Sequence, residues 1–172
     1  SAEVIQPDVL GATAVASPVA CNGESNGSVD LSVTGGNAGY SYAWSNGATT
    51  EDISGLVAGI YSVTVTDSRG CSYATSAEVI QPDVLGATAV ATEVICNGEN
   101  NGSIALSVTG GNAGYSYAWS GPNGYTADTE DISSLYAGIY TVVVTDSRGC
   151  SYTTSAEVIQ PDVLGATAVA SP

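Results

Sequence analysis

A long internal repeat constrains this chain more than any other feature of its sequence. The string SAEVIQPDVLGATAVA begins at Ser1, Ser76 and Ser155, so successive copies start 75 and 79 residues apart. Outside one loop the copies are nearly identical, which indicates duplication of a whole structural unit with little later divergence. An enzyme active site is rarely built twice in this way, so we expect no enzyme activity.

The repeat also predicts where the domains begin and end. We expect one repeat over residues 8–82 and a second over residues 83–161. Residues 1–7 would be the last strand of a preceding repeat, and residues 162–172 the first strand of a following one. Because the chain begins and ends on the same string, we interpret it as a slice of a longer array. The junction lacks Gly and Ser and contains a proline, which predicts a semi-rigid connection.

The residue pattern predicts an all-β fold. Val, Thr, Tyr and Trp are frequent and favour strands, Asn-Gly pairs favour tight turns, and no long 3.6-residue periodicity indicates a helix. Apolar and polar residues alternate in Gly27–Thr34, as in a half-buried strand. In Gly59–Asp67 the same alternation places Tyr61, Val63 and Val65 on one face. We therefore expect two β-sandwiches in series.

The charge is strongly one-sided, with 17 acidic residues against two basic ones. A surface this acidic repels phosphate backbones and anionic lipids, so we expect no nucleic-acid binding. It attracts cations such as calcium, although solubility alone accounts for it. No stretch reaches the roughly 20 apolar residues of a membrane span, so we expect no span in this segment.

The four cysteines fall as one pair in each repeat, at Cys21, Cys71, Cys96 and Cys150. Four cysteines allow three connectivities, and the repeat favours Cys21–Cys71 and Cys96–Cys150, which would make each domain self-contained. A small domain without Phe or Met has a thin core, for which disulfides are the usual remedy. Disulfides indicate an oxidising, extracellular compartment. Free buried thiols are an alternative, and zinc is disfavoured because the chain lacks His and CxxC.

Several motifs resemble a known family in combination. They are CNGExNGS followed by Val or Ile, TGGNAGYSYAWS, LxAGIYxVxVTDSRGCSY and a terminal VIQP. Together they resemble the SprB repeat, which is named for the large surface adhesin of gliding Bacteroidetes. The resemblance covers both repeats and both flanking pieces. It implies an extracellular, often very long protein whose many copies form an adhesive or stalk region, without enzyme activity.

A looser likeness to PKD and other immunoglobulin-like domains suggests structural roles for two aromatic pairs. Trp44 and Trp119 lie where such sandwiches keep a core tryptophan on their third strand. Tyr61 and Tyr140 follow a Leu-x-Ala-Gly-x pattern typical of a tyrosine corner, in which the hydroxyl bonds to upstream backbone.

Calcium is the sharpest small-ligand hypothesis, and no other cofactor is expected. If Cys21 bonds Cys71, the loop after Cys21 lies beside the turn before Cys71, and carboxylate and amide oxygens from both could bind the ion. The candidate ligands are Glu24, Asn26 and Asp67 in the first copy and Glu99, Asn101 and Asp146 in the second. The alternative is that these Asn and Asp residues only form turns.

Two further pairs of side chains allow a functional and a structural interpretation. Tyr125 and Tyr136 occur only in the second copy, as candidates for contact with a neighbouring subunit or a glycan, or as ordinary strand residues. Glu51 and Asp52 are adjacent carboxylates. Neighbours on a strand point to opposite faces, so we interpret them as a solvated edge rather than a catalytic pair.

The repeats and the family resemblance suggest two functions. The first is structural: disulfide-stapled domains in series would transmit force in an extracellular filament or a cell-surface adhesin stalk, with neighbouring repeats or subunits as partners. The alternative is an adhesive module that binds glycans or surfaces by avidity. A filament could be one continuous chain, which we prefer, or subunits joined by donation of residues 162–172 to a neighbour.

Overall fold

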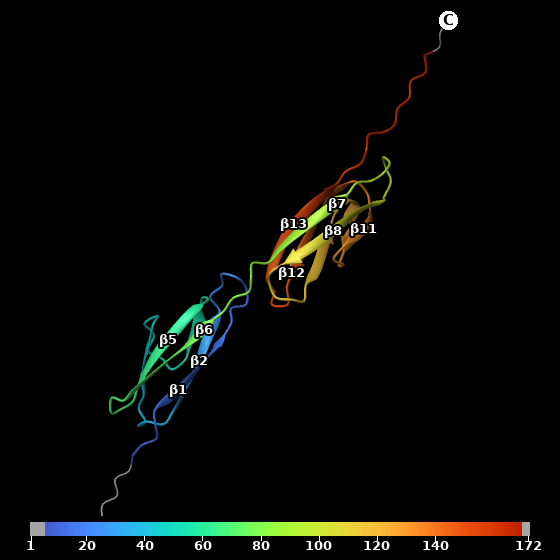
Figure 1. Cartoon of the computed structure of the whole chain (residues 1–172). Helices are drawn as coiled ribbons and strands as arrows, with labels where there is room; N and C mark the ends of the chain where they lie inside the picture. Colours follow the sequence, from blue (N-terminus) through green and yellow to red (C-terminus); the bar gives the residue numbers. More distant parts are fainter. Residues whose placement is uncertain (1–5, 170–172) are drawn as a thin grey trace, which may run out of the picture. The chain divides into compact units, whose positions relative to one another are not determined.

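The computed structural model describes residues 6–169, and these divide into two compact units (Figure 1). The boundary lies between Pro82 and Asp83. We call the unit that ends at Pro82 the first module and the unit that begins at Asp83 the second. Most of the expected strand at residues 1–7 lies outside the described residues, and Gln6 and Pro7 are not in a strand.

The first module is a sandwich of two three-stranded antiparallel sheets. One sheet has the order β1-β2-β4 and the other the order β3-β5-β6. Immunoglobulin-like sandwiches divide their strands in the same way. The first two strands and the strand before the last hairpin form one sheet, and the third strand and the last two form the other. The strands are β1 (Gly11–Ser17), β2 (Gly27–Thr34), β3 (Ser41–Trp44), β4 (Ile53–Leu56), β5 (Gly59–Thr66) and β6 (Ser72–Val79).

The second module repeats this topology with one added strand. Its sheets have the orders β7-β8-β11 and β10-β9-β12-β13. The expectation of an all-β fold of tandem immunoglobulin-like sandwiches is thereby confirmed. The strands are β7 (Gly86–Thr92), β8 (Gly102–Thr109), β9 (Ser116–Ser120), β10 (Thr126–Ala127), β11 (Ile132–Leu135), β12 (Gly138–Thr145) and β13 (Ser151–Val158).

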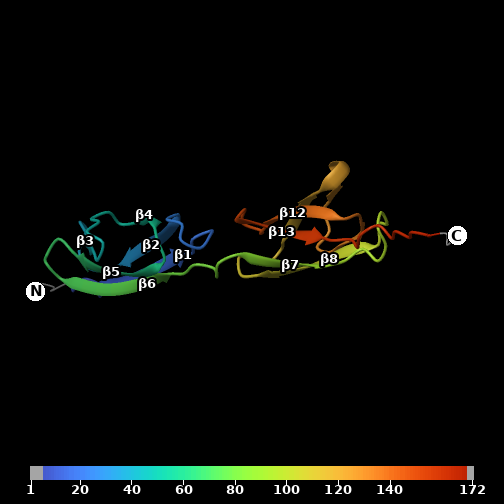
Figure 2. The ribbon, with the colours of Figure 1, turned by 90° about the horizontal axis from the view of Figure 1, so that it is seen from above.

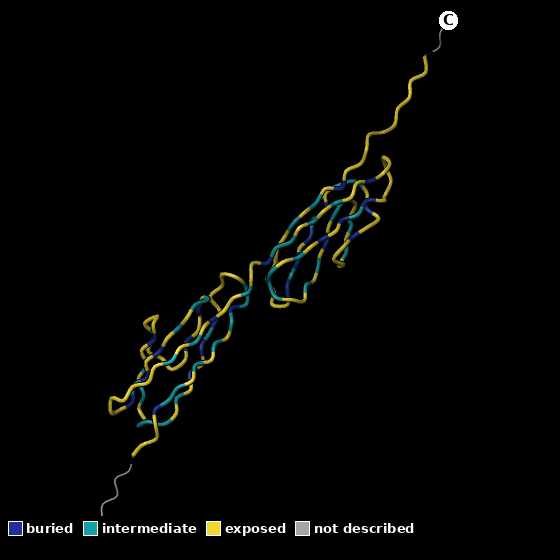
Figure 3. The backbone as a smooth tube through the Cα atoms, viewed as in Figure 1, coloured by how far each residue is buried: buried dark blue, intermediate teal, exposed yellow. Residues whose placement is uncertain are grey.

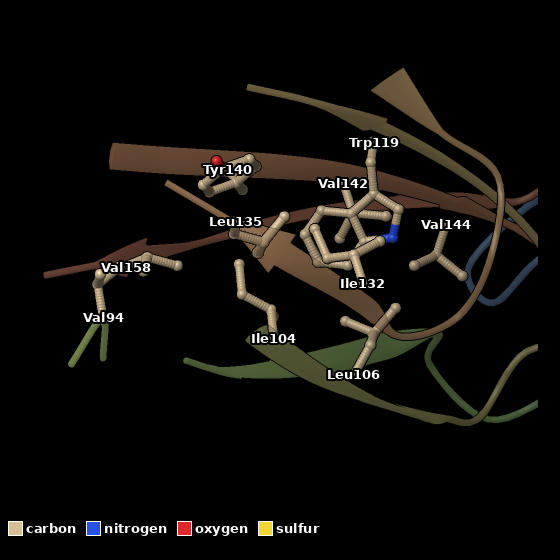
Figure 4. Close-up of a cluster of buried hydrophobic side chains, with 10 residues drawn as sticks. All are labelled: Val94, Ile104, Leu106, Trp119, Ile132, Leu135, Tyr140, Val142, Val144 and Val158. Atoms are coloured by element: carbon tan, nitrogen blue, oxygen red, sulfur yellow. The ribbon is translucent and has the colours of Figure 1, made fainter. Parts of the chain in front are cut away.

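The core of each module lies between its two sheets, and the buried backbone positions alternate with exposed ones (Figure 3). Figure 4 shows the second core, where Trp119 and Tyr140 stand among aliphatic side chains from both sheets. The predicted strand register is confirmed, because Val142 and Val144 are fully buried while the intervening Val143 is 38% exposed. Val63 and Val65 are buried in the same way in the first core.

The extra residues of the second copy form a small projection from its sandwich (Figure 2). A 3₁₀ turn over Pro122–Gly124 leads into β10, which pairs with β9. Part of the loop that differs between the two copies therefore extends a sheet.

Each module receives the chain at one end and releases it at the other. At the upstream end the Asp8 carbonyl accepts a hydrogen bond from the Gly36 amide, 2.8 Å away. At the downstream end the Val19 amide donates to the Ile80 carbonyl at 3.0 Å. The first and last strands, β1 and β6, therefore run in the same direction, and they lie side by side.

The segment after β13 has the sequence of a first strand but not its structure. Residues 162–169 are exposed and belong to no strand (Figure 3). Leu164 is 96% exposed, whereas its equivalents Leu10 and Leu85 are 8% and 7% exposed. The difference goes with strand pairing: β1 and β7 each pair with the following strand of their own module, whereas residues 162–169 pair with no strand.

The turn after β2 requires glycine. Gly35 has a φ of 66°, and a Cβ atom there would overlap the backbone carbonyl of Val9. The Gly35-Gly36 pair thus lets the turn after β2 lie against the backbone of Asp8 and Val9, just before β1 begins.

We predict that Gly35→Ala destabilises the first module by more than 2 kcal/mol, because backbone strain adds to a clash with main-chain atoms. Gly70→Ala is the matched control: its φ is also positive, at 86°, but nothing lies within 4 Å of the added Cβ. We expect the control to cost about 1 kcal/mol. Chemical denaturation of both variants measures this, and equal losses would contradict the proposed contact.

Candidate functional site

A buried carboxylate organises the upstream end of each module. Asp67, only 5% exposed, begins the turn between β5 and β6. Its Oδ1 accepts hydrogen bonds from the Arg69 and Cys71 amides, both at 2.9 Å. Its Oδ2 accepts from the backbone amide of Asn37 at 3.0 Å and from the Asn37 side chain at 2.8 Å. The carboxylate therefore ties this hairpin to the turn after β2.

The second module repeats this arrangement, with Asp146 bonded to Asn112, Arg148 and Cys150. The electrostatic consequence is that both carboxylates stay ionised in acid. Hydrogen bonds, above all from the Asn37 side chain, hold the pKa of the Asp67 carboxyl well below its usual value. Burial alone raises the pKa of the Asp146 carboxyl, but the hydrogen bonds from Asn112 and the turn backbone outweigh burial and lower it to about 2.

A polar loop occupies the downstream end of each module. In the first module the Asn22 side chain donates to the Pro82 carbonyl at 2.9 Å, and the Gly23 amide donates to the Gln81 side chain at 3.0 Å. Equivalent bonds join Asn97 to Pro161 and Gly98 to Gln160 in the second module. The loop after the first strand is thus held against the chain as it leaves.

The structure does not bring the predicted calcium ligands together. Glu24 bonds Asn26 at 2.7 Å in the downstream loop, whereas Asp67 lies in the upstream hairpin. The eight residues of β6 separate the two ends by about 26 Å. The same holds for the second set, in which Glu99 and Asn101 pair in the downstream loop and Asp146 binds the upstream turn. Among residues 6–169 no three Cys, Asp or Glu side chains form a group that could hold a metal ion.

The predicted disulfide pairing within each repeat is wrong. Cys71 and Cys96 are free and exposed, whereas Cys21 and Cys150 are disulfide-bonded. The physical reason is again the length of the sandwich. Cys21 lies in the downstream loop and Cys71 in the upstream hairpin, about 26 Å apart along β6, while the Cα atoms of a cystine lie within about 7 Å.

Sequence reasoning also missed a role for one acidic residue in each module. Oδ1 of Asp52 accepts a hydrogen bond from the Leu31 amide at 2.9 Å, and Asp131 does the same for Leu106 at 2.8 Å. The two amides belong to β2 and β8. Each lies just past the end of the pairing with the short strand β4 or β11, and the carboxylate takes the place of the missing strand partner. Asp52 therefore has a structural role, which the expectation of a merely solvated edge did not include.

The core aromatic residues each donate a hydrogen bond to the backbone, and for the two tyrosines this is the bond that their motif predicts. The Trp44 and Trp119 indoles donate to the carbonyls of Thr50 and Thr129, both at 2.9 Å. The hydroxyl of Tyr61 donates to the Val57 carbonyl at 3.1 Å, and Tyr140 donates to the Tyr136 carbonyl at 3.0 Å. These are the bonds of a tyrosine corner.

The two tyrosines peculiar to the second copy have different environments. Tyr125 packs edge-on against Tyr140, with ring centroids 5.2 Å apart and an interplanar angle of 88°. This contact covers Tyr140, which is 1% exposed, whereas Tyr61 in the first module is only half-buried. Tyr136 is 51% exposed and adjoins a shallow hollow of about 200 Å³. Tyr125 therefore contributes to the fold of its own module.

In the described part of the chain, no helix is long and apolar enough to cross a membrane.

We predict that Asp146→Asn destabilises the second module at neutral pH and that this loss shrinks in acid. A carboxyl whose pKa is lowered by folding stabilises the fold fully above its unfolded pKa of about 3.9, and this contribution is lost as the pH falls toward about 2. The exposed Asp128→Asn is the charge-matched control. Urea unfolding between pH 7 and pH 2 tests the prediction, and a difference that stays constant with pH would contradict it.

We predict that Tyr125→Ala destabilises the second module by about 1–2 kcal/mol, through loss of the edge-on contact and of buried area. Tyr136→Ala should cost less than about 0.5 kcal/mol, because its bond to Tyr140 uses the backbone carbonyl, which alanine keeps. Thermal unfolding of the two variants checks this, and equal effects would show that Tyr125 is not part of the core.

Comparisons with known proteins agree with the motifs. Curated proteins give no match. Solved structures with some likeness include an amphioxus IgVJ-C2 molecule, at 14% identity and a TM-score of 0.38, covering 73% of this chain and 91% of that one. A structure on Dscam isoform specificity has 16% identity and a TM-score of 0.42, covering 91% of this chain and 47% of that one. This chain thus spans less than half of the Dscam structure, and neither likeness adds to the topology above. The SprB repeat model matches residues 13–49 and 88–124, one segment in each of the two modules.

Proposed function

We propose that this protein is a load-bearing repeat of an extracellular filament or cell-surface adhesin stalk. The SprB match and the immunoglobulin-like sandwiches indicate a cell-surface repeat of the adhesin type. The mechanical role goes further, and the observation that carries it is the arrival and departure of the chain at opposite ends of each sandwich.

Tension on the chain would load the strands along their length. The chain arrives at the upstream start of β1 and leaves from the downstream end of β6, so a pull on both sides shears these strands against their partners. β1 pairs with β2 over seven residues, and β6 pairs with β5 over eight. Because a force along the strands loads all these hydrogen bonds together, the module resists it better than a force that opens the pairs one by one.

The avidity alternative would need an exposed patch that both modules share. The tyrosines first considered for such contacts occur only in the second copy, and Tyr125 is occupied by Tyr140. The structural role is therefore the one that both modules support equally.

We predict that single-molecule pulling on the reduced chain, with handles at Gln6 and Asp162, gives two unfolding events. Each should release roughly 25 nm of chain, from about 3.4 Å per residue. Handles at Gln6 and Ser68, both at the upstream end of the first module, should open it at a force several-fold lower. Equal forces in the two geometries would remove the mechanical assignment.

A further inference from the structure

A shallow hollow beside the projection of the second module is built largely from residues that distinguish this copy from the first. It has a volume of about 200 Å³ and is lined by residues 122–125, Ser134, Tyr136 and Tyr140. Residues 122–125 belong to the loop that is longer in this copy. Differences between two otherwise nearly identical copies thus meet at one place, as expected where one module has acquired a site of its own.

Two point substitutions at the hollow bring no gain in packing. Tyr136 replaces Val57, and the two side chains are equally exposed, at 51% and 53%. Ser134 replaces Gly55, and both residues have a positive φ, 59° and 70°. Serine is strained in this conformation, whereas glycine is not. A strained, exposed serine beside an exposed aromatic ring points to a function, because it does not serve the fold.

The loop that completes the hollow is held firmly by its own module. The Tyr125 amide donates to the Pro122 carbonyl and the Gly121 amide donates to the Tyr125 carbonyl, both at 3.1 Å. The Tyr125 ring packs on Tyr140. A Cβ atom at Gly138 would overlap the Pro122 ring, so the loop lies directly against the start of β12. The hollow is therefore formed before any ligand arrives, and binding orders little of the protein.

The hollow offers aromatic and neutral polar groups. Within residues 6–169 the side chains of Asn123 and Ser134 make no hydrogen bond, so an amide that donates and accepts and a hydroxyl that does both are available to a ligand. None of the lining residues is charged, in a chain with 17 acidic residues. An ionised ligand would find no counter-charge here, and an anionic one would be repelled by the rest of the surface.

We propose that this hollow binds a neutral pyranose unit of a glycan. The weakly positive C–H face of the sugar lies on the ring of Tyr136, whose π face is negative. The sugar hydroxyls exchange hydrogen bonds with Asn123 and Ser134. A small, open hollow takes one sugar unit and binds it with millimolar affinity. The site belongs to the second module alone and does not depend on the load-bearing role, which both modules share.

Saturation-transfer NMR on the full chain tests the site. The probes are the methyl glycosides of glucose, galactose and mannose, with methyl glucuronide as a charged sugar for comparison. We expect at least one neutral glycoside to bind in the millimolar range and the glucuronide to bind more weakly. No binding by any neutral glycoside, or no preference over the glucuronide, would overturn the proposal.

Two variants restore the residues with which the first module folds, Val57 and Gly55. Tyr136→Val should weaken binding roughly tenfold through loss of the aromatic face. Ser134→Gly should also weaken binding, whereas its urea midpoint should not fall, because glycine relieves the strain. Val143→Thr restores a first-module residue outside the hollow and should bind like the native chain. Full binding by Tyr136→Val or Ser134→Gly, or a loss in Val143→Thr, would contradict the site.

A peptide is the competing occupant, because aromatic hollows also bind proline-rich segments. A polyproline peptide is therefore measured against the native chain and Tyr136→Val under the same conditions. We expect no binding that depends on Tyr136. If the peptide binds through Tyr136 and the glycosides do not, the hollow is a peptide site and the sugar assignment is wrong.

Discussion

The buried aspartate at the hairpin before the last strand is the constraint on which the rest of each module depends. Asp67 accepts hydrogen bonds from amides of its own turn and from Asn37. The amide of Gly36, next to Asn37, donates to the Asp8 carbonyl. One carboxylate thereby connects both sheets and sets the point at which the first strand begins. Hydrogen bonds alone satisfy this carboxylate, so it needs no basic side chain beside it. That suits a chain with only two basic residues. The repetition of this network at Asp146 explains why two copies with different loops keep one architecture.

Much of the fold is predictable because strand patterns are local. The alternation in Gly59–Asp67 is enough to place Val63 and Val65 in the core, and the Leu-x-Ala-Gly-x-Tyr spacing is enough to predict the hydroxyl bond of Tyr61. The loops are harder to predict. Nothing in the period of the strands shows that Tyr125 folds back onto Tyr140, since a side chain in an insertion has no register to follow.

The cysteines and the calcium ligands show where local patterns fail. Assigning one disulfide to each repeat assumes that residues of one repeat are near one another, but a sandwich about 26 Å long has two distant ends. The signal that was available is directional. Cys21 follows a first strand and Cys71 precedes a last strand, and these strands run the same way, so the two residues lie at opposite ends of the module. The calcium hypothesis took its geometry from the assumed disulfide, and the structure places its proposed ligands at opposite ends of the module.

The buried carboxylates also bear on the surroundings in which a module stays folded. Because hydrogen bonds from Asn112 and the turn backbone keep the Asp146 carboxyl ionised down to about pH 2, the turn that it organises is not lost by protonation in mildly acidic surroundings. This end of the module is therefore insensitive to the acidification that would neutralise an ordinary exposed carboxylate.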